Sequence, residues 1–366
     1  MPFTLTPEEI DRIEVAEFLG IRLDPVGYID LSTIIVISTK YFLEFFVFCF
    51  MLYNRNYPPL KVKNVPIMFS LYFGGFTWFL GDIFTGGLVH LYGNPVLTSC
   101  RFTVIWCRAC LGAFYITSLF GLRTYALYHV FVKGKAFKGP VFIIGFSVTV
   151  SSILLFAIIS TVLPEDMTAI YEPLLDVCFP NKNFIIATLV IIWMIWTFVA
   201  AMTWGIRHVT FSFSEHVEIL SSFSILFIIS AMNTVCLFVI NIYTASLVWR
   251  NLLVYTNHVG ASVAFWVVMG VPTYNCMFNR EEYLQYWIAI IKEDAMEDVY
   301  NYSPTVNVDT MTFNDNVDIL AKNPASLMSS QNSFITSTMH TLPSTPRSTY
   351  TNTNMYLVSA LPHNCV

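Results

Sequence analysis

The chain has 366 residues, of which 55% are hydrophobic and 12% charged, and its formal net charge is -5. Because a soluble domain carries about 25% charged residues, this composition excludes a single soluble globular core and indicates that lipid surrounds most of the chain. The small net charge also gives no sign of nucleic-acid binding.

Residues 1–27 contain no basic stretch followed by an apolar run, so we expect no cleavable signal peptide. We expect this N-terminal segment to lie outside the cell and the first apolar segment to act as its own targeting signal.

Seven apolar segments follow, and each exceeds the ~20 residues that a helix needs to cross a hydrocarbon core of ~30 Å. A helix is the open-chain structure that pairs every backbone N–H and C=O inside lipid. Only Val248–Asn251 and their neighbours separate the last two segments, which predicts a tight turn. The sequence therefore predicts an all-α, seven-transmembrane helix bundle over residues 28–278. The expected helices are Tyr28–Tyr53, Asn64–Tyr92, Arg101–Val132, Pro140–Val162, Asn183–Ile206, Val217–Leu247 and Leu252–Phe278.

The connections after the first, third and fifth segments are basic, whereas the alternate connections carry few Lys or Arg residues. Because short basic loops stay in the cytoplasm, this pattern predicts an N-terminus outside and a C-terminus inside. We therefore expect a multi-pass protein of the plasma membrane. The basic residues are Arg55, Lys61, Lys63, Arg123, Lys133, Lys135, Lys138 and Arg207, with His208 and His216.

Two further segments follow the seventh helix. In residues 279–300, Tyr283, Tyr286, Trp287 and Ile290 recur at helical spacing, which predicts an amphipathic helix on the inner membrane surface; a frayed helix end is the alternative. Residues 301–366 are rich in Ser, Thr, Asn and Pro, which predicts a disordered cytoplasmic tail. Its Ser-Pro and Thr-Pro sites fit phosphorylation by kinases, and a merely solvated tail is the alternative.

The predicted topology sorts the eight cysteines. It leaves only Cys100 and Cys178 outside, where an oxidising environment permits a disulfide. We expect this pair to tie the fourth connection to the top of the third helix, with two free thiols as the alternative. Cys107 and Cys110 form a C-x-x-C pattern inside a membrane helix, where packing is the simpler explanation.

Charged residues at membrane depth are costly and are usually functional. Asp82 and Arg108 each lie about eight residues below the outer end of neighbouring helices, which places both ~12 Å deep and predicts an ion pair. The pair could line a ligand cavity open to the outside, or it could fix helix packing, and the two roles are compatible. Lys40 and Glu44 lie one turn apart and are expected to neutralise each other along one helix face.

Polar residues of the last two helices are further candidates for a ligand cavity. Asn233, Asn241 and Asn257 are expected to face inward, although Asn between membrane helices is more often a packing contact. His258 is expected near the depth of Arg108.

Enzyme signatures are scarce, so we expect no catalytic function, metal or cofactor. The seven His residues show no H-x-x-x-H or H-E-x-x-H spacing, and no G-x-S-x-G or P-loop pattern occurs. The seventh segment contains no Lys that could hold a retinal Schiff base.

The stretch Arg55-Asn56-Tyr57-Pro58-Pro59-Leu60-Lys61-Val62-Lys63-Asn64-Val65-Pro66 is similar to a PPLK-basic-x-P stretch of divergent fungal seven-helix receptors. Some of those receptors carry a regulator-of-G-protein-signalling domain after the last helix, which the polar tail here is too short to hold. Cys100 with Trp106, and Arg123 at the inner end of the third helix, also fit the pattern of those receptors. The resemblance covers residues 28–300. Leu122-Arg123-Thr124-Tyr125 replaces the Asp-Arg-Tyr triad of rhodopsin-like receptors, and Pro272-Thr273-Tyr274-Asn275 replaces their Asn-Pro-x-x-Tyr.

The resemblance implies a G-protein-coupled receptor that senses an extracellular ligand and signals through a heterotrimeric G protein. The expected ligand cavity contains Asp82, Arg108, Trp106, His258 and Asn233, and the expected G-protein contacts are Arg123, Lys133, Lys135 and Arg207. Arg123 could instead be a topology anchor that snorkels to the membrane surface.

Other functions stay open. A transporter or channel-like protein would use Asp82, Arg108, Lys40 and Glu44 along a pathway. An intramembrane enzyme and a non-signalling structural protein are further alternatives.

Overall fold

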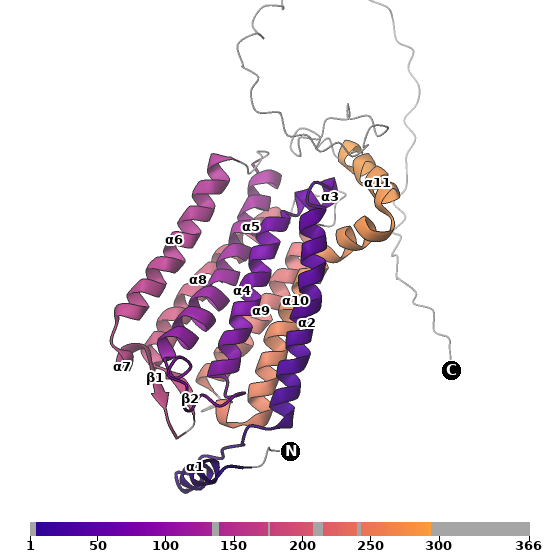
Figure 1. The fold of residues 1–366 in the computed structure, drawn as a ribbon. Helices are drawn as coiled ribbons and strands as arrows, with labels where there is room; N and C mark the ends of the chain where they lie inside the picture. The colour runs from indigo at the N-terminus through magenta and orange to yellow at the C-terminus, as the bar shows by residue number, and fades with distance from the viewer. Residues whose placement is uncertain (1–4, 134–138, 175, 208–214, 240–242, 294–366) are drawn as a thin grey trace, which may run out of the picture. The chain divides into compact units, whose positions relative to one another are not determined.

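The computed structural model describes residues 5–133, 139–174, 176–207, 215–239 and 243–293. Lys135, Lys138, His208 and the predicted tail 301–366 lie outside them. The described part is mostly helical, and it contains seven helices that are long and apolar enough to cross a membrane (Figure 1). They are α2 Tyr28–Tyr53, α4 Val65–Thr85, η1 Arg101–Phe114 continued by α5 Tyr115–Phe131, α6 Pro140–Val162, α8 Lys182–Ile206, α9 Glu215–Phe238 and α10 Leu247–Phe278. The predicted number of spanning helices is therefore confirmed.

Three predicted helix boundaries are wrong. The second spanning helix ends at Thr85 rather than Tyr92, because the chain turns at Gly86 and Gly87, and Gly87 adopts a φ of +74° that favours glycine. The sixth helix ends at Phe238, and the seventh begins at Leu247. Val248–Asn251 therefore form the first turn of α10 and not a loop.

Buried polar contacts explain why α10 begins so early. The side chain of Arg250 binds Asp30 in the first turn of α2, and Asn251 donates to the same carboxylate at 2.9 Å. Thr33 in turn donates to Asn251 at 2.6 Å. These contacts hold the start of α10 against the start of α2. They give the polar side chains of Arg250 and Asn251 protein partners in place of water.

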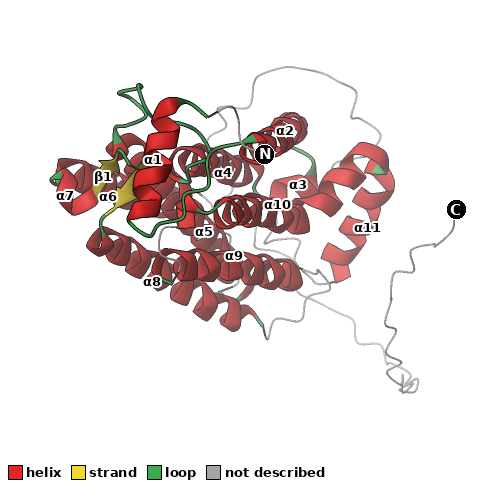
Figure 2. Cartoon of the chain, turned by 90° about the horizontal axis from the view of Figure 1, so that it is seen from below, coloured by secondary structure: helices red, strands yellow, loops and turns green. Residues whose placement is uncertain are grey.

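One end of the bundle carries short elements that the sequence did not predict. Helix α1, Pro7–Phe18, begins with a capping box in which Glu9 N donates to Thr6 Oγ1 (3.3 Å) and Thr6 N donates to Glu9 (2.8 Å). The antiparallel strands β1, Ala169–Glu172, and β2, Val177–Pro180, follow the short helix α7, Glu165–Thr168. Figure 2 views the molecule from this end and shows α1 lying across it beside the strands.

The opposite end of the bundle, which is the predicted cytoplasmic end, carries two further helices. Helix α3, Pro58–Val62, contacts α11, Arg280–Glu293, and Tyr57 donates to the Arg280 carbonyl at 2.9 Å. The helix expected within residues 279–300 is therefore present from Arg280 to Glu293. Its position on a membrane surface stays a prediction.

Helices α4 and η1 approach each other unusually closely. η1 is a π-helix of 14 residues, whose backbone bonds run from i to i+5. A Cβ atom on Gly81 would lie 2.7 Å from the backbone nitrogen of Arg108, and one on Gly112 would lie 3.0 Å from the Cα atom of Trp78. Such small residues let membrane helices pack backbone to backbone. The close approach brings Arg108 beside Asp82.

Candidate ligand-binding site

Five polar residues inside the bundle contact one another, and we call Asp82, Arg108, Asn233, Asn257 and His258 the polar core. Asp82 of α4 is 2% exposed, and its Oδ1 lies 3.1 Å from Arg108 Nε of η1. Its Oδ2 accepts from Asn257 Nδ2 at 2.9 Å and lies 3.3 Å from His258 Nε2, both on α10. The ion pair expected from equal depth is present, and one carboxylate joins three helices.

The polar core reaches two more helices. Asn233 of α9 donates from Nδ2 to Asn257 Oδ1 at 2.6 Å. On the other side, Tyr41 OH of α2 lies 3.0 Å from His258 Nδ1, and Lys40 Nζ donates to the His258 carbonyl at 3.2 Å. Contacts of the polar core therefore connect α2, α4, η1, α9 and α10.

A cavity, which we call the first cavity, borders the polar core and lies between α4, η1, α5, α8 and α9. Arg108 and Asn233 reach it from the polar core. Pro180, two residues after Cys178, lines it from the β2 strand, so it lies toward the end of the bundle that carries α1. Its lining residues include Trp78, Arg108, Ala113, Ile116, Thr117, Phe184, Thr188, Trp196, Leu226, Ser230 and Asn233.

The predicted cavity residues divide into three groups. Arg108 and Asn233 line the first cavity, whereas Asp82 and His258 lie behind them in the polar core. Trp106 lies elsewhere, because its Nε1 donates to Thr161 Oγ1 of α6 at 3.1 Å. Sequence reasoning missed Trp78, Phe184, Thr188, Trp196 and Ser230, and no motif or spacing marks them as lining residues.

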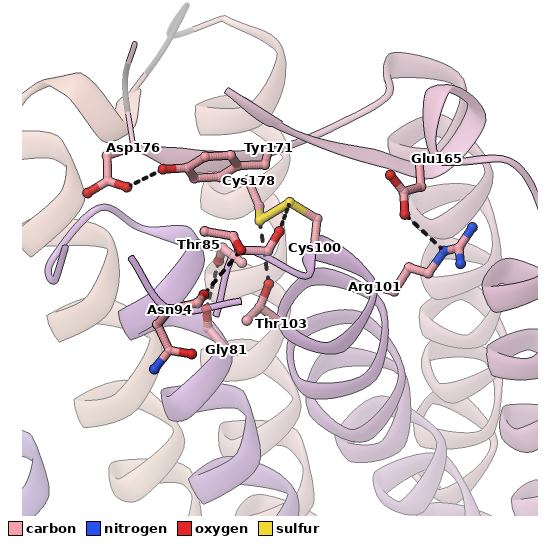
Figure 3. Close-up of a disulfide and its surroundings, with 11 residues drawn as sticks. Gly81, Thr85, Asn94, Cys100, Arg101, Thr103, Glu165, Tyr171, Asp176 and Cys178 are labelled. Atoms are coloured by element: carbon pink, nitrogen blue, oxygen red, sulfur yellow. Dashed lines mark hydrogen bonds and ion pairs between the residues drawn. A yellow bond between two sulfur atoms is a disulfide. The ribbon is translucent and has the colours of Figure 1, made fainter. Parts of the chain in front are cut away.

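The structure joins Cys100 to Cys178, with the two sulfur atoms 2.01 Å apart, so the predicted pairing is present (Figure 3). The bond ties β2 to the start of η1, and Thr103 Oγ1 lies 3.7 Å from the Cys178 sulfur. Figure 3 also shows Arg101 beside Glu165, with Arg101 Nε 3.7 Å from Glu165 Oε1. Both contacts fix the connection from which Pro180 reaches the first cavity.

Asp176, in the turn between the strands, holds α1 to the hairpin. We call Glu9, Arg12, His90, Tyr171 and Asp176 the hairpin cluster. Asp176 accepts from Tyr171 OH at 2.7 Å and lies 3.5 Å from Arg12, while His90 lies 3.4 Å from Asp176 and 2.8 Å from Glu9. Burial acts to raise the pKa of the Asp176 carboxyl, but hydrogen bonds from His90, Tyr171 and the Leu91 N–H, with the Arg12 charge, outweigh it and lower that pKa.

A second cavity lies in the other half of the bundle. Lys40 and Glu44 line it, and their Nζ and Oε2 atoms lie 3.2 Å apart, so the expected pair is present. Ser262 of α10 donates to Glu44. Arg123 of α5, which is 6% exposed, lines the same cavity.

The other predicted G-protein contacts lie apart from this cavity. Lys133 Nζ lies 5.8 Å from the ring centre of Tyr125, and the Arg207 guanidinium stacks 3.4 Å from the ring centre of Trp204. Lys135 lies outside the described residues.

Comparison with known proteins adds no family. No protein-family model matches the chain, and no curated protein sequence is similar to it. The resemblance carried by Arg55–Pro66 therefore stays an expectation. Within the described part of the chain, no group of three His, Cys, Asp or Glu residues is placed to hold a metal ion.

Proposed function

We propose that the chain is a seven-transmembrane receptor that binds a ligand in the first cavity and signals through a heterotrimeric G protein. One observation carries the proposal: two residues of the first cavity, Arg108 and Asn233, belong to a polar core that contacts five helices. A ligand shifts a conformational equilibrium only through different affinities for the two states. A ligand that touches Arg108 or Asn233 more favourably in one helix arrangement would therefore favour that arrangement throughout the bundle.

The proposed orientation puts the N-terminus outside and the C-terminus in the cytoplasm of a cell that carries the protein in its plasma membrane. The basic loops support it. The disulfide and α1 also lie at one end of the bundle, and α3 and α11 lie at the other (Figure 1). An oxidising exterior at the disulfide end agrees with this assignment.

The proposed G-protein surface lies at the end of the bundle that carries α3 and α11. Arg123 lines the second cavity and is almost fully buried, so a G protein would reach it only after the helices around that cavity part. Lys133 and Arg207 would flank the opening, and Lys135 is a further expected G-protein contact.

The test is nucleotide exchange on a G protein reconstituted with the full chain in nanodiscs, with cell extracts as the ligand source. Arg123→Ala should abolish basal and extract-stimulated exchange. Arg22→Ala is the matched control, because the Arg22 side chain is 93% exposed and lies at the opposite end. Lys133→Glu, at an exposed position, should also reduce exchange and does not depend on replacing a buried residue. Equal exchange in all variants, or none above empty nanodiscs with several G-protein types, would overturn the proposal.

A transporter or channel-like protein is the second candidate, because two cavities lie in opposite halves of the bundle and share lining residues. Ile116 of α5 and Leu226 of α9 line both cavities. Solute flux into vesicles containing the chain, without effect on nucleotide exchange, would favour this candidate.

A further inference from the structure

The lining of the first cavity points to a class of ligand. We infer that it takes a small, uncharged and mainly apolar molecule with a carbonyl or hydroxyl oxygen at one end. The inference rests on the proposed function, in that the first cavity is taken as the ligand site.

Apolar and aromatic side chains make up most of the lining. Trp78 contributes ring surface from α4, Phe184 and Trp196 contribute it from α8, and Ile and Leu side chains fill the space between them. Ligand pockets of this kind gain affinity from buried apolar surface and orientation from a few polar groups. A sugar would leave most of its hydroxyl groups without partners against these walls, which costs roughly 1–3 kcal/mol for each buried unsatisfied group.

The charge of the lining favours a neutral ligand. Arg108 is the charged residue among the described lining residues, and Asp82 already balances it at 3.1 Å. A ligand cation would meet Arg108 with no lining carboxylate to pair with. A ligand anion would add a second negative charge beside Asp82, which is 2% exposed. Burying either unpaired charge is far more costly than burying a neutral group.

The polar groups of the lining indicate where the ligand oxygen lies. Thr117 and Thr188 donate to backbone oxygens at 2.7 and 2.9 Å, and Asn233 Nδ2 donates to Ile229 O and Asn257 Oδ1. The Arg108 guanidinium has five N–H groups. Its contacts with Asp82 and Thr85 use Nε and Nη1, and Tyr243 also lies beside it, with the ring centre 5.9 Å from Cζ, so these three partners do not use all five N–H groups. Arg108 therefore offers the strongest remaining donor, and a ligand oxygen would accept from it.

Four ten-carbon probes test the inference: 2-decanone, decane, decylamine and decanoate. The readout is the ligand-induced rise in the thermal unfolding midpoint of the full chain in nanodiscs, since binding to the folded state raises its stability. The expected order has 2-decanone above decane, and both above the two charged probes. Decylamine or decanoate exceeding 2-decanone would overturn the inference.

Matched variants separate binding in the cavity from partition into lipid. Ala113→Phe fills the cavity and should abolish the effect of 2-decanone, whereas Ala187→Phe, at an exposed position of α8, should leave it unchanged. Arg108→Lys keeps the charge beside Asp82 but changes the donor geometry. It should cost 2-decanone roughly tenfold in affinity and leave decane unchanged. An effect of 2-decanone that persists in Ala113→Phe would overturn the inference.

Nucleotide exchange measured on the same samples separates this inference from the proposed function. Cavity-dependent binding of 2-decanone without exchange on any G protein supports the ligand class and counts against the receptor. Exchange that is stimulated by extract, together with preference for a charged probe, supports the receptor and overturns the ligand class.

Discussion

Arg250 and Asp30 form a bidentate ion pair, with Nη2 2.6 Å from Oδ2 and Nε 2.8 Å from Oδ1, and their side chains are 2% and 0% exposed. The remaining three guanidinium N–H groups donate to the carbonyls of Asp24, Pro25 and Thr244 at 2.9, 3.0 and 3.5 Å. The carboxylate also accepts from the Gly27 N–H at 3.0 Å. Because the partners of both charges are complete, the pair can persist at the end of α2 and α10 away from water.

Asp30→Ala should destabilise the protein strongly. The substitution leaves the Arg250 charge buried without its counter-ion, and breaking a buried pair in this way costs about 3–5 kcal/mol. Thermal unfolding in nanodiscs measures the effect, with Asp11→Ala on the exposed face of α1 as the matched control. The double variant Asp30→Leu with Arg250→Met should recover part of the loss, because it removes both charges. Equal midpoints for Asp30→Ala and Asp11→Ala would contradict the prediction.

Ile116 and Leu226 should act as an apolar partition between the two cavities. Both side chains are buried, both line both cavities, and they belong to one apolar cluster. Ile116→Ala or Leu226→Ala removes part of the packing that keeps the cavities separate, and such truncations cost about 2–5 kcal/mol in a core. The packing that these variants remove stabilises the arrangement in which the two cavities are separate. Basal nucleotide exchange should therefore rise several-fold if the chain is a receptor. Solute leakage from vesicles should rise instead if it is a transporter.

The matched controls for the partition are Ile105→Ala and Leu119→Ala. Both residues are 0% exposed, and neither lines the two cavities. They lose the same number of atoms from the bundle core. If these controls raise exchange or leakage as much as the partition variants do, general loosening of the bundle accounts for the result and the partition has no special role.

The orientation of the bundle can be tested with cysteines introduced one at a time into a Cys49→Ser, Cys365→Ser background, which removes the exposed free thiol of α2 and the thiol of the C-terminal tail. Val96, which is 61% exposed, lies in the connection before η1, and Arg55 is exposed in the connection after α2. With the N-terminus outside, a membrane-impermeant maleimide should label Val96→Cys in intact cells. It should label Arg55→Cys only after the membrane is permeabilised. The reverse pattern would invert the proposed topology and remove the G-protein surface from the cytoplasm.

The spanning helices could be predicted because hydropathy is summed over about 20 residues, so single polar residues do not obscure the signal. Their ends depend on contacts between distant parts of the chain. Arg250 and Asn251 are polar, so their local sequence favours a loop. They belong to a helix because the fold places Asp30, which is 220 positions before Arg250, beside them. Helix α1 had a local signal, the Thr6–Glu9 capping box, which a search for start signals would have found.

The polar core was partly predictable and the cavity lining was not. Equal depth on neighbouring helices was enough to pair Asp82 with Arg108. Which residues face a cavity depends on how each helix is rotated, and the sequence does not fix that rotation. Trp106 and Arg108 are two positions apart, which is about half a turn both in an α-helix and in the wider π-helix that η1 forms, so they point in nearly opposite directions. Assigning both to one cavity was therefore inconsistent with a helix, and Trp106 packs against α6.

Acidification should release α1 from the hairpin. The pKa of the Asp176 carboxyl is lower than usual, so its contacts contribute stability above the ordinary Asp pKa of about 3.9, and this contribution is lost as the pH falls through the lowered value. Hydrogen exchange of the α1 amides, corrected for the intrinsic pH dependence, should therefore accelerate below about pH 4. Asp176→Asn removes the charge that faces Arg12 and His90, so α1 should already exchange faster at pH 7 and should respond less to acid. Asp11→Asn, at an exposed position of α1, should behave like the unaltered chain. An identical acid response in Asp176→Asn and Asp11→Asn would show that Asp176 does not hold α1 in place.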